Sequence, residues 1–230
     1  MMKKLGLIGG MGPESTLVYY REILYGVKNK LGVDAFPPIS IDSINLYEML
    51  KYCDNDRSRL ICLLEQSIEN LAAGGAQFAA LTSNTSHLVY KELEASSPIP
   101  LVSILDTTIA EVERLGYKKI GLLGTIFTME GDFFREPFAR RGINLVTPDA
   151  TTRRFINDCI TTELELGLVK ESTLSAFNKI ISDMYKENGI EAVILGCTEL
   201  PLLFKDAQTP VVCLDTMQLH IEALVDMIIE

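Results

Sequence analysis

Residues 192–201 read AVILGCTELP, an apolar run that ends in Gly196 and a polar cluster that begins with Cys197. A short apolar run followed by a helix start is typical of a buried strand in a parallel sheet. Residues 78–87 read FAALTSNTSH and follow the same pattern, with Ser83 in place of the cysteine. A glycine introduces each stretch, and the glycine pair and the Ser83–Cys197 pair are each 114 positions apart. The two stretches therefore predict equivalent strands in two repeated units.

Strand-like and helix-like segments alternate along the whole chain. Strict alternation of this kind predicts parallel sheets with helices on both faces. Strands are expected at residues 4–8, 39–44, 78–82, 101–104, 119–123, 192–195 and 211–214. Helices are expected at residues 14–28, 57–73, 86–95, 107–115, 129–141, 155–166, 174–187 and 217–229.

A second pair of similar segments supports the internal repeat. Residues 5–10 read LGLIGG and residues 120–125 read IGLLGT, with an offset of 115 between the shared glycines. A nearly constant offset is the signature of a duplicated unit. The sequence predicts an α/β fold of two pseudosymmetric lobes, residues 1–98 with 208–230 and residues 99–207. Because ligands bind beyond the carboxyl ends of parallel strands, we expect the active site in the cleft between the lobes, with Ser83 and Cys197 on opposite sides.

The composition is that of a globular protein with an excess of negative charge. Of 230 residues, 47% are hydrophobic and 23% are charged, and the formal net charge is −10. Nucleic acid is excluded as an expected partner, because phosphates require a basic face. No apolar run approaches the roughly 20 residues of a membrane span, and the apolar start is too short for a signal peptide. We therefore expect a cytoplasmic protein without membrane contact.

The five cysteines favour neither a disulfide framework nor a zinc site, because their number is odd and no CxxC spacing occurs. Four of them, Cys53, Cys62, Cys159 and Cys213, lie in or near amphipathic or apolar segments and are expected to be small core residues. Cys197 is followed at once by polar residues after an apolar strand. Because a thiol at a helix N-terminus has a lowered pKa, Cys197 is the expected functional cysteine.

Four polar loops follow expected strands and open helices. Their side chains and N–H groups can cap the helix or bind a substrate carboxylate. The first loop has only part of a dinucleotide motif, since Ser15 replaces the third glycine and no acid ends the next strand. The two histidines, His87 and His220, are candidates for supporting the site or for a purely structural role. The candidate substrate-binding residues are Met11, Gly12, Asn84, Thr85, Thr125, Thr128, Thr198 and Glu199.

Four motifs spread over nearly the whole chain resemble those of the aspartate/glutamate racemase superfamily. In order, they are GGMGPEST at residues 9–16, NTSH at 84–87, GTIFTM at 124–129 and GCTELP at 196–201. The resemblance implies two pseudosymmetric lobes, a homodimer, a small amino or carboxylic acid as substrate, and no pyridoxal phosphate, metal or other cofactor. It also implies two cysteines that act as acid and base on opposite faces of the substrate Cα. The second cysteine falls on Cys197 and the first falls on Ser83.

The chain departs from the family pattern at two positions. A serine hydroxyl removes a Cα proton only with a neighbouring base, and His87 is the one local candidate beside Ser83. Many aspartate-acting members have a lysine that pairs with a substrate carboxylate, and the resemblance implies Phe155 at that position. Arg153 and Arg154 are near in sequence but lie on different helical faces. An acidic side chain on the substrate is therefore less expected than an apolar one.

Three functions follow from these residues. The first is a racemase of aspartate, glutamate or a related amino acid, in which Cys197 is one acid/base and Ser83 a weak second one. The second is a one-thiol relative, such as a decarboxylase of disubstituted malonates, which needs to protonate only one face of its intermediate. The third is a binding protein that kept the site and lost turnover.

Overall fold

The computed structural model describes residues 2–32, 34–205 and 207–230. The chain divides into two compact units, Met1–Ile104 with Met217–Glu230, and Leu105–Thr216. Each unit contains one four-stranded sheet in which all paired strands run parallel. The predicted fold class, α/β with two parallel sheets flanked by helices, is confirmed. Among the described residues, no helix is long and apolar enough to cross a membrane.

The two sheets have equivalent strand orders, β2-β1-β3-β4 in the first unit and β6-β5-β7-β8 in the second. The central strands of both are almost entirely buried, as expected for apolar runs covered on both faces. The strands are β1 (Leu5–Gly9), β2 (Ile39–Ser43), β3 (Phe78–Leu81), β4 (Leu101–Val102), β5 (Lys119–Gly124), β6 (Asn144–Val146), β7 (Ala192–Gly196) and β8 (Val212–Asp215).

The register of the central strands agrees with the predicted internal repeat. Leu5 of β1 lies opposite Phe78 of β3, and Ile120 of β5 lies opposite Ala192 of β7. The first residues of these pairs are 115 positions apart and the second residues are 114 apart, the offsets found in the sequence. The same pairing therefore places the ends of β3 and β7 at equivalent positions of their sheets.

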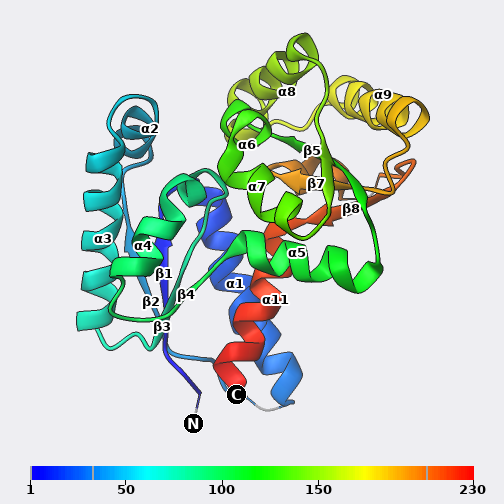
Figure 1. Ribbon diagram of the computed structural model, residues 1–230. Helices are drawn as coiled ribbons and strands as arrows, with labels where there is room; N and C mark the ends of the chain where they lie inside the picture. The colour runs from blue at the N-terminus through cyan, green and yellow to red at the C-terminus, as the bar shows by residue number, and fades with distance from the viewer. Residues whose placement is uncertain (1, 33, 206) are drawn as a thin grey trace. The chain divides into compact units, whose positions relative to one another are not determined.

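Helices cover both faces of the first sheet (Figure 1). Alternate strand residues point to opposite faces, so Leu7 packs with α1 and α11, whereas Ile8 packs with α2, α3 and α4. The helices of this unit are α1 (Pro13–Leu31), α2 (Leu46–Asn55), α3 (Arg57–Ala73), the 3₁₀ helix η1 (Thr85–Val89), α4 (Tyr90–Ser96) and α11 (Thr216–Ile229), which starts at the last residue of the second unit.

The second unit packs one face of its sheet against α8, α9 and α10. Ile156 of α8, Ile181 of α9 and Leu203 of α10 share a buried cluster with Val193 and Leu195 of β7. The helices of this unit are α5 (Ile104–Leu115), which starts at the last residue of the preceding segment of the first unit, α6 (Ile126–Glu130), α7 (Asp132–Arg140), α8 (Ala150–Thr162), the 3₁₀ helix η2 (Leu164–Leu166), α9 (Glu171–Asn188) and α10 (Leu200–Phe204).

Several predicted elements differ from the structure. The helix expected at residues 129–141 is two helices, α6 and α7, because the backbone is extended at Gly131. The helix expected at residues 155–166 starts earlier, at Ala150, where Asp149 caps it, and ends at Thr162. Helices α2 and α10 and the three-residue strand β6 were not predicted. Helix α2 does have apolar residues at helical spacing, namely Leu46, Met49, Leu50 and Cys53, so its sequence contains a signal that the predicted helix ranges left out.

The predicted lobe boundaries were placed too early in the sequence. Residues 99–104 were assigned to the second lobe and residues 208–216 to the first. In the structure β4 pairs with β3 and β8 pairs with β7, so the boundaries fall after Ile104 and after Thr216. Each short edge strand thus completes the sheet that precedes it. The predicted interlobe cleft stays a prediction.

Candidate active site

The predicted catalytic and substrate-binding residues all follow the carboxyl end of a central strand. Because β1 pairs with β3 and β5 pairs with β7, each unit gathers two of these loops at one edge of its sheet. The first unit contributes Met11, Gly12, Ser83, Asn84 and Thr85, and the second contributes Thr125, Thr128, Cys197, Thr198 and Glu199.

The loop between β1 and α1 is fixed by its own backbone and hydroxyl groups. Gly10 has a φ of 80°, and a Cβ there would lie 2.2 Å from the Ile44 carbonyl oxygen, so only glycine fits. Thr16 Oγ1 accepts a hydrogen bond from the Gly10 N–H and donates one to the Gly12 carbonyl, both at 3.0 Å. Met11 is buried in the core cluster of α3, so its side chain is a packing group and only its backbone can offer a ligand contact.

Cys197 lies in direct contact with a carboxylate. Its Sγ donates a hydrogen bond to Glu199 Oε2 at 2.9 Å, and Thr198 Oγ1 donates to the same oxygen at 3.0 Å. All three residues are at most 8% exposed. The Leu200 N–H closes the turn by donating to the Cys197 carbonyl at 3.1 Å. The loop therefore holds a thiol and a proton acceptor together in a buried polar turn.

The predicted lowering of the Cys197 pKa is wrong. Burial raises the pKa of this thiol well above its ordinary value, and the Glu199 carboxylate raises it further by charge and by accepting the S–H hydrogen bond. The backbone N–H of Glu199 acts in the opposite direction but is outweighed. Helix α10 starts at Leu200 and has only five residues, so the thiol is not at the end of a long helix. Cys197 is therefore a protonated thiol at neutral pH.

A second carboxylate, that of Glu165 in η2, acts on the same pair and was missed by sequence reasoning. Its charge contributes to raising the pKa of Cys197, and burial together with Glu199 raises the pKa of Glu165 itself. Nothing in the sequence of residues 163–166 indicates that Glu165, rather than Glu163, lies near Cys197. The packing of η2 against α10 distinguishes them, and this is a tertiary contact.

Thr128 holds the ends of β5 and β7 together. A Cβ on Gly124 would lie 2.9 Å from the Gly196 carbonyl oxygen, and a Cβ on Gly196 would lie 2.9 Å from Thr128 Cγ2. These separations are shorter than side chains allow, so both strand ends require glycine. Thr128 is 1% exposed, which indicates a packing role rather than contact with a ligand.

The start of α6 is capped twice. Thr125 Oγ1 accepts from the Thr128 N–H at 3.4 Å, and Asn157 Oδ1 of α8 accepts from the Ile126 N–H at 2.9 Å. Asn157 was not among the predicted site residues. It is 31 positions from Ile126, and no sequence pattern indicates a hydrogen bond between them. The Thr125 hydroxyl therefore caps the helix in part, which is one of the two roles predicted for the polar residues of these loops.

His87 supports the Ser83 loop but does not contact the Ser83 hydroxyl. The Ile104 N–H donates to His87 Nε2 at 3.1 Å, so Nδ1 carries the ring hydrogen and donates to the Ser83 carbonyl at 2.9 Å. Burial lowers the pKa of His87 to about 4, against a smaller opposing effect of the bond to Ser83. The ring is neutral and both nitrogens bind backbone groups. A proton relay from Ser83 through His87 therefore has no support in this geometry.

His220 is a second buried neutral histidine with a structural role. Its Nε2 donates to the Val102 carbonyl at 3.1 Å, and its Nδ1 accepts from the Tyr19 hydroxyl at 2.9 Å. Burial lowers the pKa of His220 to about 3, and the like charge of His87 adds to this shift. Together with Tyr90, whose hydroxyl donates to the Leu101 carbonyl, the histidines satisfy backbone groups in and beside the edge strand β4.

Of the two arginines considered for a substrate carboxylate, Arg153 pairs with a carboxylate, whereas Arg154 is exposed and binds a backbone carbonyl through Nε. Phe155 lies on α8, is 44% exposed, and its ring centroid is 6.4 Å from that of Phe177. Arg153 forms an ion pair with Glu130 at 3.0 Å and also binds the Pro148 carbonyl. The neighbouring arginine, Arg154, is bonded to a backbone carbonyl in its own helix.

The five cysteines are free thiols, and Cys62 is exposed rather than a core residue as predicted. Among the described residues, no group of three or more His, Cys, Asp and Glu side chains could hold a metal ion.

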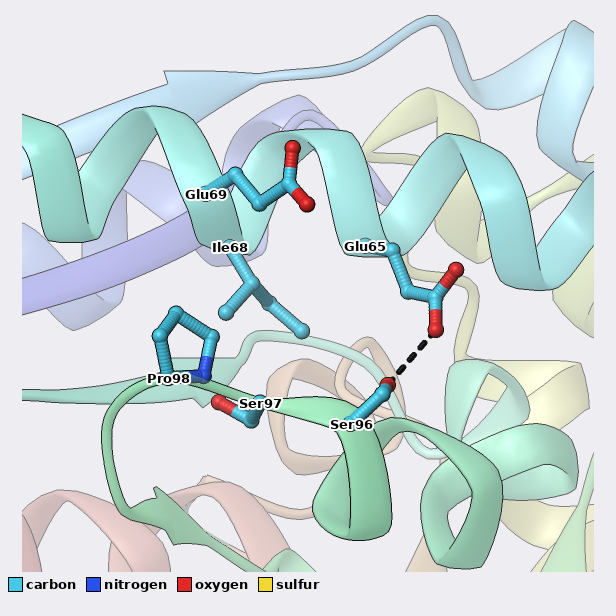
Figure 2. A pocket seen from close by; sticks show the side chains of 6 residues that line it. All are labelled: Glu65, Ile68, Glu69, Ser96, Ser97 and Pro98. Atoms are coloured by element: carbon cyan, nitrogen blue, oxygen red, sulfur yellow. Dashed lines mark hydrogen bonds between the residues drawn. The ribbon is translucent and has the colours of Figure 1, made fainter.

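A cavity of about 110 Å³ lies between α3 and the loop after α4 (Figure 2). There the Ser96 hydroxyl donates to Glu65 at 2.6 Å. This cavity contains none of the predicted site residues.

Comparison with known proteins gives one consistent result. A family model described as Asp/Glu/Hydantoin racemase matches residues 8–224. The broad specificity amino-acid racemase RacX of Bacillus subtilis is 23% identical over 221 residues, which cover 92% of each chain. A Yersinia pestis protein provisionally described as an Asp/Glu racemase is 36% identical, with a TM-score of 0.92. An aspartate racemase homologue from Pyrococcus horikoshii is 33% identical, with a TM-score of 0.86. Both structural matches cover all of each chain.

Proposed function

The chain belongs to the Asp/Glu/hydantoin racemase family, and from this premise we propose that it moves the Cα proton of a small amino acid. In this proposal Cys197 carries the proton, and neither pyridoxal phosphate nor a metal takes part. The observation that carries the proposal is the contact at the end of β7, where a buried thiol lies 2.9 Å from a carboxylate oxygen of Glu199. That pair can hold and exchange one proton.

The resting state of this pair is a thiol beside a carboxylate. In that state Cys197 is ready to donate a proton to a carbanion at the substrate Cα, because the raised pKa keeps the sulfur protonated. Removal of a Cα proton requires the thiolate, and Glu199 Oε2 is the acceptor positioned to take the thiol proton first. We therefore expect Cys197 to work in both directions, with protonation the easier one.

Ser83 is proposed as a weak second group. Its hydroxyl has an ordinary pKa far above neutrality, and His87, the candidate base, is held by backbone groups at both ring nitrogens. Proton transfer on this side would proceed through water or not at all. Exchange of the Cα proton with solvent is then faster than inversion of the amino acid.

The substrate would be held by the loops around these two residues. We propose that backbone N–H groups and short polar side chains at the strand ends bind its carboxylate. Thr128 is assigned to packing, for the reasons given above. The residues proposed to contact the substrate are Met11 and Gly12 through their backbone, and Asn84, Thr85, Thr125, Thr198 and Glu199.

The assembly and its setting are carried over from the family. We propose a homodimer that works in the cytoplasm on a small amino acid or carboxylic acid. A net charge of −10 makes nucleic acid an unsuitable partner.

One observation favours a second candidate, a one-thiol decarboxylase of disubstituted malonates. The His87 geometry leaves Ser83 without a side-chain base, and loss of CO₂ leaves an enediolate that needs a proton from one face only. Cys197 alone would then suffice. Products from a panel of disubstituted malonates, with no exchange in any amino acid, would select this alternative. Saturable ligand binding without either reaction would select a binding protein.

The test is a screen for deuterium incorporation at Cα in D₂O over all amino acids, with each enantiomer measured separately. The wild-type protein is expected to exchange at least one amino acid, and Cys197→Ala is expected to lose this exchange. Cys62→Ala is the matched control, because that thiol is exposed and lies outside the proposed site. Failure of every amino acid to exchange would reject the racemase proposal.

A further inference from the structure

Two donors share one carboxylate oxygen at the end of β7. Cys197 Sγ donates to Glu199 Oε2 at 2.9 Å, and Thr198 Oγ1 donates to the same oxygen at 3.0 Å. The terminal torsion of a glutamate is broad, so a single bond from the thiol would leave the carboxylate able to rotate. The Thr198 hydroxyl supplies a second contact, and it acts on the oxygen that faces the sulfur.

The backbone of this turn is fixed by bonds that do not involve the Thr198 side chain. The Leu200 N–H donates to the Cys197 carbonyl and the Leu202 N–H donates to the Glu199 carbonyl, both at 3.1 Å. Leu200 also packs with Cys197 in a buried cluster. Loss of the threonine hydroxyl should therefore leave the course of the chain unchanged and affect mainly the end of the Glu199 side chain.

Burial increases the importance of the second donor. Cys197 is 7% exposed, and Thr198 and Glu199 are each 8% exposed, so little water is available to replace a lost bond. A hydrogen bond from a hydroxyl to a carboxylate is charge-assisted and is stronger in such surroundings than in water. Threonine is also restricted at χ1, so its hydroxyl loses little freedom when it binds the carboxylate.

We propose that Thr198 is a positioning residue, whose hydroxyl holds Glu199 Oε2 against the Cys197 thiol and so keeps the proton-accepting pair assembled. The effect on turnover rests on the proposed function, whereas the effect on the pair itself does not need a substrate. The role goes beyond the substrate contact proposed above for Thr198. A hydroxyl that donates to Glu199 still has lone pairs that can accept from a substrate ammonium group.

Three variants separate the hydroxyl from the shape of the side chain. Thr198→Val keeps the shape and removes the hydroxyl, Thr198→Ser keeps the hydroxyl and removes the methyl group, and Thr198→Ala removes both. If Thr198→Val does not fold, Thr198→Ala takes its place. Thr162→Val is the matched control, because Thr162 is exposed on α8 and its hydroxyl donates to the Asp158 carbonyl of the same helix at 2.7 Å.

The first readout is the infrared S–H stretching band of Cys197, assigned by subtracting the spectrum of Cys197→Ala. A hydrogen bond lowers the frequency of this band, so it should move to higher frequency in Thr198→Val. In Thr198→Ser and Thr162→Val it should stay at the wild-type position.

The second readout is alkylation of Cys197 by iodoacetamide at neutral pH, followed by mass spectrometry of its peptide. The nearby carboxylate raises the pKa of the thiol, so a carboxylate that rotates away should lower this pKa. Alkylation should therefore be faster in Thr198→Val than in the wild type, and Thr198→Ser should react at the wild-type rate.

Turnover gives a third comparison. Thr198→Val is expected to lower kcat for Cα exchange by about 10-fold and to change KM by less than about 2-fold, the size expected for one hydrogen bond to a charged group. A residue that only bound the substrate would instead raise KM and leave the S–H band where it is.

The substrate-free readouts separate this inference from the proposed function. A shifted S–H band in Thr198→Val that is restored in Thr198→Ser supports the inference, even where no amino acid exchanges and the racemase proposal fails. The inference is overturned if the band and the alkylation rate of Thr198→Val equal those of the wild type, because the carboxylate would then stay in place without the hydroxyl. It is also overturned if Thr198→Ser shows the same shifts as Thr198→Val, since the methyl group would then be responsible.

Discussion

The ends of β3 and β7 occupy equivalent positions in two sheets of the same strand order, yet their chemistry differs. At the end of β7, Cys197 donates to a carboxylate and lies within the influence of a second one. At the end of β3, the Ser83 carbonyl is bound by a neutral histidine that is committed to backbone groups. The two units thus share a scaffold, whereas only the β7 end pairs a thiol with a carboxylate.

The largest difference between the two strand ends is expected in loss of function. Cys197→Ala should lower Cα exchange by about 10³-fold, within the range for removal of a general acid or base. Ser83→Ala should change exchange by less than about 5-fold. The comparison is made with deuterium incorporation at a saturating amino acid concentration, and equal losses in the two variants would show that both strand ends take part.

Removal of the carboxylate at the β7 end should give the next largest effect. Glu199→Gln is expected to lower exchange by about 10²-fold, because the thiol loses its proton acceptor. The same change removes a negative charge, so the pKa of Cys197 should fall towards its ordinary value. The rate of alkylation by iodoacetamide as a function of pH measures this shift. A pKa that rises or stays constant would contradict the assigned role of Glu199.

His87, the histidine at the β3 end, is expected to affect the free energy of unfolding rather than the rate of catalysis. Its folded-state pKa of about 4 is below the ordinary value of 6.5, so the folded protein takes up the proton at a lower pH than the unfolded chain. Above pH 6.5 the residue contributes no pH dependence, and as the pH falls from about 6.5 to 4 the free energy of unfolding should decrease. The loss attributable to His87 is about 3 kcal/mol.

Urea unfolding at a series of pH values measures this slope. His87→Gln removes one titrating group, so its stability should change less steeply over the same range, whatever its absolute stability. An equally steep slope in the variant would assign the acid sensitivity to other groups, with His220 the first to examine, since its pKa is lowered to about 3.

The smallest expected effect is a gain of function at the β3 end. Ser83→Cys introduces the thiol that the family resemblance implies, and inversion of the amino acid should increase by about 10-fold relative to exchange. The increase is modest because no carboxylate corresponding to Glu199 accompanies the new thiol. Polarimetry or chiral chromatography measures inversion. No gain would count against a two-sided site.

The sequence was sufficient for the scaffold and insufficient for the electrostatics. Short apolar runs located β1, β3, β5 and β7, because strands buried on both faces leave that pattern. The pKa of Cys197 could not be read in the same way, since its direction depends on burial and on where Glu199 Oε2 lies. Glu165 was missed for a related reason, because tertiary packing alone brings η2 to α10.

The sequence did not distinguish residues that pack or hold the backbone from residues that contact the substrate or move a proton. Met11 and Thr128 were grouped with substrate-binding candidates, yet both side chains are buried in packing contacts. His87 was a candidate relay until the bond from the Ile104 N–H fixed its ring hydrogen on Nδ1. A polar residue after a strand marks the right edge of the sheet, but its partners decide what it does.

The most direct test of the asymmetry compares two rates for one amino acid in D₂O, exchange of the Cα proton and inversion of configuration. If Cys197 is the effective group and Ser83 a weak one, one enantiomer should incorporate deuterium with retention at least about 10-fold faster than it inverts. Equal rates of exchange and inversion in the wild-type protein would contradict the account, because they would require an effective acid/base at both strand ends.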